Sequence, residues 1–215
     1  MSPRDPKIRR TGRPTGADAE ATRRRILSAA LSLFSQWGYD ATRVKDVALK
    51  AGVNAALVHH YFGDKDALYD TVLLDALQPL TILGQGLLVR GLPTDLLLAA
   101  WVEVLFAYFE KHRDILWLIT RECMGHAGRV RGVVVEALSP IFKQTAAAIE
   151  SGHQTSADMD ASYLVINTLG MLSVWFTHNT LIDVVLEGDS TVPSARMKQR
   201  DQIMKLLTNG VLGKR

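Results

Sequence analysis

The segment from residue 42 to residue 65, TRVKDVALKAGVNAALVHHYFGDK, constrains the fold of this chain more than any other. Four of its apolar residues repeat at the spacing of one face of a short helix: Val44, Val47, Ala48 and Ala51. Gly52 predicts the end of that helix, because a residue without a Cβ enters the left-handed backbone region at little cost. A second short helix is expected from about Asn54, with Val58 and Phe62 turned inward. Two short helices joined by such a turn form the pair that enters the major groove of DNA, the alternative being an ordinary helical hairpin.

The composition indicates a globular protein. The chain has 215 residues, of which 47% are hydrophobic and 22% charged, enough for one large or two small cores. A single cysteine permits no intrachain disulfide, which fits a reducing cytoplasm. The basic start of the chain has no apolar core behind it, so we do not expect a signal peptide. No uninterrupted apolar run approaches ~18 residues, so no membrane-spanning segment is expected.

The positive charge is concentrated at one end of the chain. Residues 1–25 contain eight basic and three acidic side chains, whereas the whole chain has a formal charge of only +3. The remaining residues are therefore slightly acidic. A basic tail is often only a solvated segment, but its place beside the helix pair favours binding to a polyanion.

The periodicity predicts an all-α fold of about nine helices. Residues 1–16, rich in proline and glycine, are predicted to be a disordered basic arm. The helix-turn-helix domain is expected over residues 17–77, and a helical effector-binding and dimerisation domain over residues 78–215. No stretch alternates polar and apolar residues over a useful length, and there is no internal repeat.

Several helix boundaries follow from local signals. Gly38 is expected to end a first helix that begins near residue 17, and the side-chain oxygen of Thr42 is expected to cap the next helix. Gly63 or Asp64 should cap a further helix that continues beyond Pro79. Towards the C-terminus, residues 158–187 are predicted to form the longest helix and residues 194–208 a final amphipathic one.

A set of fixed spacings extends through residues 17–70, and its members are Gly38, Thr42, Val47, Ala48, Ala51, Gly52, Val53, Asn54, His60, Tyr61, Phe62, Lys65 and Leu68. This pattern resembles the N-terminal domain of the tetracycline-repressor (TetR) family of transcriptional regulators. The resemblance implies a homodimer that reads a palindromic DNA operator and responds to a small-molecule effector. Two positions depart from the family pattern, because Ala56 replaces a usual glycine and His59 a usual tyrosine. The operator sequence therefore does not follow from the resemblance.

The predicted DNA contacts fall into two groups. Phosphate contacts position such a protein, whereas contacts to base edges specify the sequence. We expect phosphate contacts from Lys65, Tyr61, His60 and Thr42, and either kind from Arg43. The side chains expected in the groove are Lys45, Asn54, Ala55, Ala56 and His59. Each of them could instead be a solvated side chain.

The remainder of the chain is expected to sense the effector and to form the dimer. Aromatic, sulfur-containing and polar side chains are candidates for an effector pocket, although many such aromatics are simply core residues: Trp101, Phe106, Phe109, Trp117, Arg121, Phe142, Tyr163, Asn167, Met171, Trp175 and His178. The last two long helices are the predicted dimer surface, with Leu169, Leu172, Phe176 and Met204 in it. Effector binding is expected to move the helix that joins the two domains and so separate the reading helices from the operator.

Other classes of protein are less consistent with the sequence. Cys123 and His126 have a C-x-x-H spacing, which can supply two zinc ligands. No second pair of ligands completes a tetrahedral site. No nucleophile elbow, phosphate-binding loop or dinucleotide fingerprint is present, so we expect neither catalytic residues nor a cofactor. A redox-responsive Cys123 and an architectural DNA-binding protein without an effector remain as alternatives.

Overall fold

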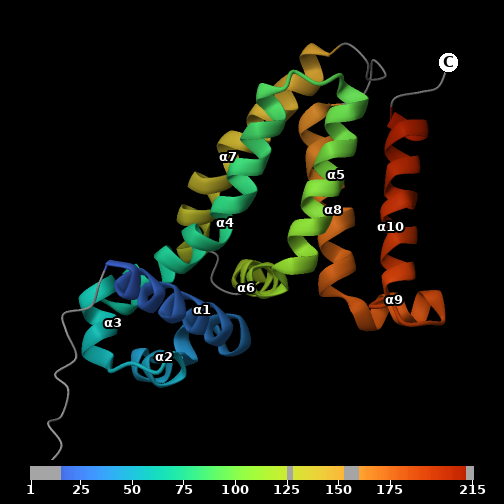
Figure 1. The fold of residues 1–215 in the computed structure, drawn as a ribbon. Helices are drawn as coiled ribbons and strands as arrows, with labels where there is room; N and C mark the ends of the chain where they lie inside the picture. The colour runs from blue at the N-terminus through green and yellow to red at the C-terminus, as the bar shows by residue number, and fades with distance from the viewer. Residues whose placement is uncertain (1–15, 125–127, 153–159, 212–215) are drawn as a thin grey trace, which may run out of the picture.

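The computed structural model describes residues 16–124, 128–152 and 160–211, and over these ranges every regular element is a helix (Figure 1). The predicted all-α fold is confirmed, with ten α-helices in the described residues instead of about nine. The elements are α1 Gly16–Ala41, α2 Val44–Ala51, α3 Ala55–Phe62, α4 Lys65–Val89, α5 Thr94–Lys111, α6 Arg113–Met124, α7 Gly128–Ser151, α8 Ala161–Thr177, α9 Asn179–Leu186, α10 Pro193–Lys205 and a terminal π-helical turn Leu206–Val211. The predicted disordered arm lies almost entirely outside the described residues.

The first three helices and the start of α4 share one small core. Val47 of α2 and Val58 of α3, both predicted to face inward, are almost completely buried. Phe34 of α1 packs edge-on against Tyr69 of α4, with ring centroids 4.9 Å apart. Burial of these side chains orients two helices of eight residues each, which are too short to be stable alone.

Gly38 interrupts α1, as the sequence predicts. Its φ of 83° and ψ of 172° lie in a backbone region that is essentially restricted to glycine. The helical turn beyond it leads directly to α2. The guanidinium of Arg121 on α6 lies 3.2 Å from the position that a Cβ of residue 38 would occupy. The backbone conformation therefore requires glycine at this position, and an added Cβ would also require a small shift of the Arg121 side chain.

The predicted capping role of Thr42 is wrong. Arg43, not Thr42, occupies the N-cap position of α2. The Thr42 hydroxyl is fully buried and donates to the carbonyl oxygen of Gly38 at 2.7 Å. Thr42 thus fastens the end of α1 from inside the domain, where its side chain has no access to a phosphate.

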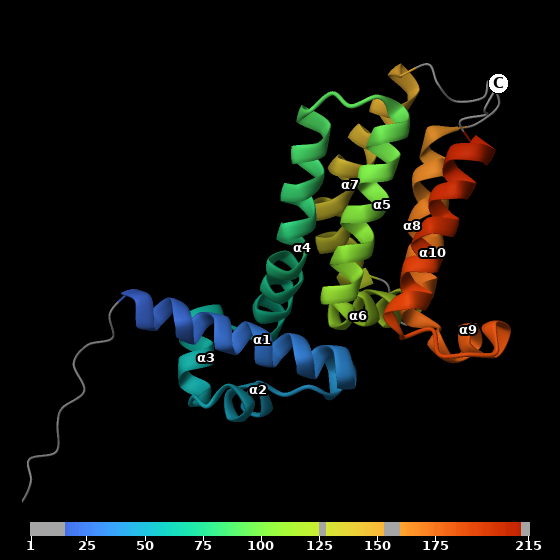
Figure 2. The same ribbon diagram turned by 45° about the vertical axis from the view of Figure 1, so that its right-hand side comes forward.

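The second bundle is built from long helices that lie beside one another, with α4 and α7 as one pair and α5 and α8 as another (Figure 2). α6 crosses their lower end and packs against α1. α4 belongs to both bundles, because it begins in the small core and continues through Pro79 to Val89. The predicted domain boundary at residue 77 therefore falls inside a continuous helix.

By length and apolar composition α4 could cross a membrane, and α8 with α9 would pass the same test as one bent span. No such segment was expected from the sequence. Part of the apolar surface of α4, including Leu68, Leu73 and Leu77, is buried against neighbouring helices, whereas residues such as Ile82 and Val89 are exposed. This burial is typical of the core helix of a globular protein, which meets the same criteria of length and composition.

The single helix predicted over residues 158–187 is wrong. Over the described part of that range, α8 ends at Thr177 and α9 begins at Asn179, with a bend of 89° between them. The Asn179 amide donates to the carbonyl oxygen of Trp175 and to the hydroxyl of Ser190. Short polar side chains compete in this way with helical hydrogen bonds, so α9 turns away from the bundle (Figure 2).

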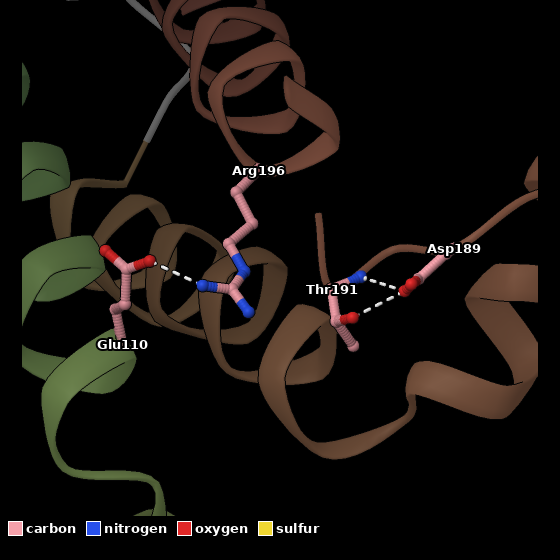
Figure 3. Close-up of polar contacts among 4 residues, drawn as sticks. All are labelled: Glu110, Asp189, Thr191 and Arg196. Carbon is pink, nitrogen blue, oxygen red and sulfur yellow. Dashed lines mark hydrogen bonds and ion pairs between the residues drawn. The ribbon is translucent and has the colours of Figure 1, made fainter. Parts of the chain in front are cut away.

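α10 is attached to α5 by ion pairs. Arg196 donates to the carboxylate of Glu110 at 2.6 Å, as Figure 3 shows. In the preceding loop, the hydroxyl and the backbone N–H of Thr191 both donate to Asp189 (Figure 3). These hydrogen bonds lower the pKa of Asp189 below its ordinary value. The final helix predicted over residues 194–208 is confirmed in its α-helical part by α10.

Replacing Gly38 by alanine should lower the free energy of unfolding by about 1–3 kcal/mol, because alanine is strained at this φ and ψ. Gly86 is the matched control, because it is exposed within α4 and no neighbouring atom lies within 4 Å of the place that an added methyl group would occupy. Gly86→Ala should instead stabilise the chain by up to about 1 kcal/mol, because alanine favours helix. Urea denaturation measures the free energy of unfolding of both variants. Equal effects of the two substitutions would contradict the assigned strain.

Candidate nucleic-acid interface

The turn between α2 and α3 has a defined geometry. Gly52 has a φ of 66°, in the left-handed region. Its N–H donates to the carbonyl oxygen of Leu49, and the N–H of Val53 donates to that of Ala48. This pair of bonds is the Schellman motif, which ends a helix and turns the chain sharply. The predicted role of Gly52 is confirmed.

The start of α3 is fixed by Asn54. Its side-chain oxygen accepts from the N–H of Leu57 at 2.7 Å, so Asn54 is the N-cap. The residue is exposed, and its amide nitrogen is the group that remains for a partner. Asn54 is predicted to contact DNA, and a hydrogen bond donated by this amide nitrogen is consistent with the geometry. Acceptance by its oxygen would compete with the cap.

The outer face of α3 carries Ala56, His59 and His60, all exposed. Val58 and Phe62 occupy the opposite face and are buried, as predicted. Ala55 and Tyr61, predicted beside the reading residues, are half-buried and pack against the core. The exposed surface of this helix is therefore narrower than the sequence suggests, with two imidazoles as its polar groups.

The two imidazoles differ in their surroundings. A ring nitrogen of His59, Nδ1, lies 2.6 Å from the carbonyl oxygen of Gly63, which can only accept. Nδ1 must therefore carry the proton, and Nε2 is directed away from this bond. The His60 ring lies 5.7 Å from that of Tyr61 in an edge-on arrangement. His59 thus closes the end of α3 and presents one nitrogen to a partner.

The cationic side chains around α3 are of two kinds. Arg43 and Lys45, at the start of α2, are exposed. Lys65, at the first turn of α4, is half-buried: its ammonium lies 4.1 Å from the ring centroid of Tyr39 and donates to the carbonyl oxygen of Asp40. Lys65 therefore also stabilises the domain, whereas Arg43 and Lys45 extend into solvent beside the reading helix.

The arginines at the start of α1 are also divided. Arg24 and Arg25 are exposed. Arg23 instead contacts the domain, with its guanidinium 3.9 Å from the carboxylate of Asp75 and 5.7 Å from the ring centroid of Phe62. The other basic residues of the N-terminal segment lie outside the described residues.

A separate feature lies in the second bundle, where helices α4 to α8 line an apolar cavity of about 580 Å³ that is partly open to solvent. Of the predicted effector residues, Phe109 and Phe142 line it. Leu169, predicted for the dimer surface, lines it as well. Most of the remaining wall is aliphatic, from residues such as Leu80 and Ile119. Periodicity does not distinguish an aliphatic residue that lines a cavity from one that fills the core, so these wall residues could not be identified from the sequence.

The other predicted effector residues lie elsewhere. Trp101, Phe106 and Trp175 are buried in the core, Met171 is half-buried, and Trp117, Tyr163, Asn167 and His178 are exposed. The ring of Trp101 lies against the place of a Cβ on Gly84, and His178 bonds to the hydroxyl of Thr177. None of these side chains contributes to the cavity wall. Their predicted role in effector binding is therefore not supported by this cavity.

Arg121 is also placed away from the cavity. Its guanidinium donates to the carbonyl oxygen of Gln36 on α1 at 3.0 Å. A cation at the C-terminal end of a helix is favourable, because the last carbonyl groups carry partial negative charge. Arg121 connects the two bundles and does not face a ligand inside the cavity.

Two of the predicted dimer contacts are wrong. Leu172 is 0% exposed and Phe176 1% exposed within a single chain. Phe176 packs against Phe106 and Phe109, with ring centroids 5.1 and 6.0 Å apart. A second chain cannot reach either residue without unfolding the bundle. Met204 is half-buried and remains compatible with an interface.

The described residues contain no group of three or more histidine, cysteine, aspartate or glutamate side chains that could hold a metal ion. The side chains of Cys123 and His126 lie outside the described residues, so the predicted alternatives that involve them are not addressed by the structure.

Comparison with known proteins agrees with the helix-turn-helix geometry. Residues 26–72 match the family described as bacterial regulatory proteins, tetR family. Over 107 residues the chain is 32% identical to the HTH-type transcriptional repressor SCO4008 of Streptomyces coelicolor, covering 50% of this chain and 52% of that protein. Over 66 residues it is 42% identical to the HTH-type transcriptional regulator RutR of Escherichia coli, covering 31% of each. The matched part thus spans about half or less of these relatives.

Solved structures resemble the whole fold. The TetR family regulator PfmR of Thermus thermophilus has a TM-score of 0.67 at 22% identity, covering 90% of this chain and 96% of that one. The fatty acid degradation regulator FadR of Bacillus halodurans has a TM-score of 0.70 at 16% identity, covering 90% and 97%. At these identities the likeness concerns the fold alone. The family match thus assigns residues 26–72 to the tetR family of bacterial regulatory proteins, and the solved structures share the fold of the chain around this segment.

Proposed function

We propose that this chain is a sequence-specific DNA-binding regulator of transcription, most consistent with a repressor that a small molecule releases from its operator. The exposed outer face of α3, held at a fixed angle by the Gly52 turn and the Asn54 cap, carries this proposal. Such a face can enter a major groove, while Arg43 and Lys45 reach the flanking phosphates. The named relatives are transcriptional regulators, which supports a cytoplasmic protein without an enzymatic role.

We infer that the protein acts as a homodimer, because one eight-residue helix offers few contacts and a two-fold pair reads a palindrome. The outer side of α8 offers a suitable surface. Tyr163, Ile166 and Val174 lie on one stripe of it and are 46–66% exposed. Next to this stripe, α9 presents Leu181, Val184 and Val185, which are 61–73% exposed. Exposed apolar surface of this extent is typical of protein interfaces. These residues replace Leu172 and Phe176 in the proposed interface.

α6 offers a route from the cavity to the DNA-binding bundle. One side of it, with Ile115 and Ile119, lines the cavity. Another side, with Asp114 and Trp117, faces α1 across a small hollow that Gln36 also lines. Arg121, one turn further on, bonds to the carbonyl oxygen of Gln36. A ligand that displaces α6 would therefore act directly on the end of α1, in addition to the predicted movement of α4.

Selection from a random pool of duplexes with the purified full chain tests the proposed function. We expect a palindrome whose half-sites are centred about one helical turn apart, because each chain presents one reading helix. Enrichment of no sequence, with binding that only falls with salt, would favour the alternative of an architectural DNA-binding protein without an effector.

Arg43→Ala and Lys45→Ala should each weaken binding to the selected operator and to unrelated duplexes alike. Each removes one exposed phosphate contact, so the slope of log affinity against log salt concentration should fall by about 1. Lys198→Ala, which removes an exposed positive charge from α10, is the matched control and should leave the slope unchanged. Fluorescence anisotropy at several salt concentrations measures this. Equal slopes for all three variants would contradict the assigned contacts.

Ile166→Asp and Val185→Asp should convert the dimer to monomers. A carboxylate buried at an apolar interface costs about 2 kcal/mol or more, roughly a 30-fold rise in the dimer Kd. Val89→Asp, at an 87% exposed position at the end of α4, is the control. Sedimentation velocity at micromolar concentration distinguishes the two states. If both variants sediment like the unmodified chain, the proposed surface is not the dimer interface.

A further inference from the structure

The wall of the cavity is almost entirely hydrocarbon. α4 contributes leucines, α6 contributes Ile115 and Ile119, and α7 contributes Val134 and Leu138. Phe109 and Phe142 add aromatic faces. No side chain among the described residues of the wall carries a formal charge. At about 580 Å³ the cavity has the size of ordinary small-molecule sites, which are mostly apolar and have a few polar groups.

Four polar side chains reach the wall, and two of them already have partners. The Tyr108 hydroxyl donates to the carbonyl oxygen of Ala76 at 2.5 Å. Burial raises the pKa of Tyr108 well above its ordinary value, as expected for a dry environment. The Ser173 hydroxyl donates to the carbonyl oxygen of Gly170 within α8.

The other two polar side chains, Thr120 on α6 and Ser139 on α7, are half-buried. Their hydroxyls make no hydrogen bond with the part of the chain that the structure describes. A hydroxyl can donate and accept, so this pair can satisfy a neutral polar group of a ligand. Among the described residues of the wall, only Thr120 and Ser139 have hydroxyls that are free both to donate and to accept a hydrogen bond.

We infer that the cavity binds a neutral, predominantly aliphatic molecule with one hydrogen-bonding group directed at Thr120 and Ser139. This inference rests on the proposed function in one respect, namely that the cavity is the effector site. The class of ligand itself follows from the wall, because buried apolar area supplies the affinity and two hydroxyls supply the orientation.

The described residues of the wall offer no counter-charge to a ligand whose charged group lies inside the cavity. Transfer of an ion from water to an apolar environment is costly unless a counter-charge or several hydrogen bonds replace the water. Arg121, the cation that the sequence suggested for an anionic effector, is bonded to Gln36 on the far side of α6. It provides no counter-charge within the cavity.

Three probes of equal chain length test the ligand class: 1-decanol, decanoate and decylammonium, each titrated into the full chain by calorimetry at neutral pH below its aggregation threshold. We expect decanol to bind once per chain, at least tenfold more tightly than either ion, with a negative heat-capacity change. Decanoate or decylammonium binding as tightly as decanol would overturn the inference, and so would the absence of decanol binding.

Substitutions then assign the binding to the cavity. Ser173→Phe fills the space beside α8 and should weaken decanol binding at least tenfold, while Ala147→Phe adds the same ring on the exposed side of α7 and should not. Ser139→Leu, which removes a hydroxyl from the wall, is a second variant in case Ser173→Phe fails to fold, as judged by circular dichroism. Unchanged decanol binding in the folded wall variants would place the site elsewhere and overturn the inference.

A separate measurement distinguishes the ligand class from the regulatory function. Decanol should reduce the affinity for the selected operator, and Arg121→Met should diminish that reduction while leaving decanol binding intact. If decanol binds in the cavity and operator affinity does not change, the ligand class stands and the proposed release by an effector fails.

Discussion

The structure depends on the burial of one side of α3. A helix of eight residues does not hold its shape or direction in water without tertiary contacts. Val58 and Phe62 supply those contacts, because their side chains enter the core formed by α1, α2 and the start of α4. The outer face with Ala56, His59 and His60 is therefore fixed relative to the whole domain. A change in the position of this face therefore moves the whole domain as a unit.

Two connections can move the domain. α4 is continuous from the core beside α3 to the far end of the second bundle, so displacement of its C-terminal half changes the position of its start. The second connection is the contact between α6 and the end of α1, where Arg121 bonds to Gln36 beside Gly38. Both helices line the cavity, so a ligand there is in contact with both connections at once.

The sequence predicted what depends on local signals and failed where tertiary packing decides. Gly38, Gly52 and the inward residues of α3 follow from backbone freedom and periodicity, and all were predicted correctly. Threonine is a common helix-capping residue, yet the hydroxyl of Thr42 donates to the buried carbonyl oxygen of Gly38 instead. Nothing in the apolar pattern of residues 158–187 reveals that Asn179 bonds to Ser190 across the following loop, which stabilises the bend after Thr177.

The same limit applies to the effector and dimer residues, and α8 shows why. Its residues face three environments: Leu164 and Leu172 the core, Leu169 and Ser173 the cavity, and one further stripe, with Ile166, the solvent. All three sides carry large apolar residues, so composition cannot assign them. The arrangement has a mechanical consequence under the proposed function. A ligand that presses on the cavity side of α8 also displaces its outer stripe, which would alter the spacing between two paired chains and hence between their reading helices.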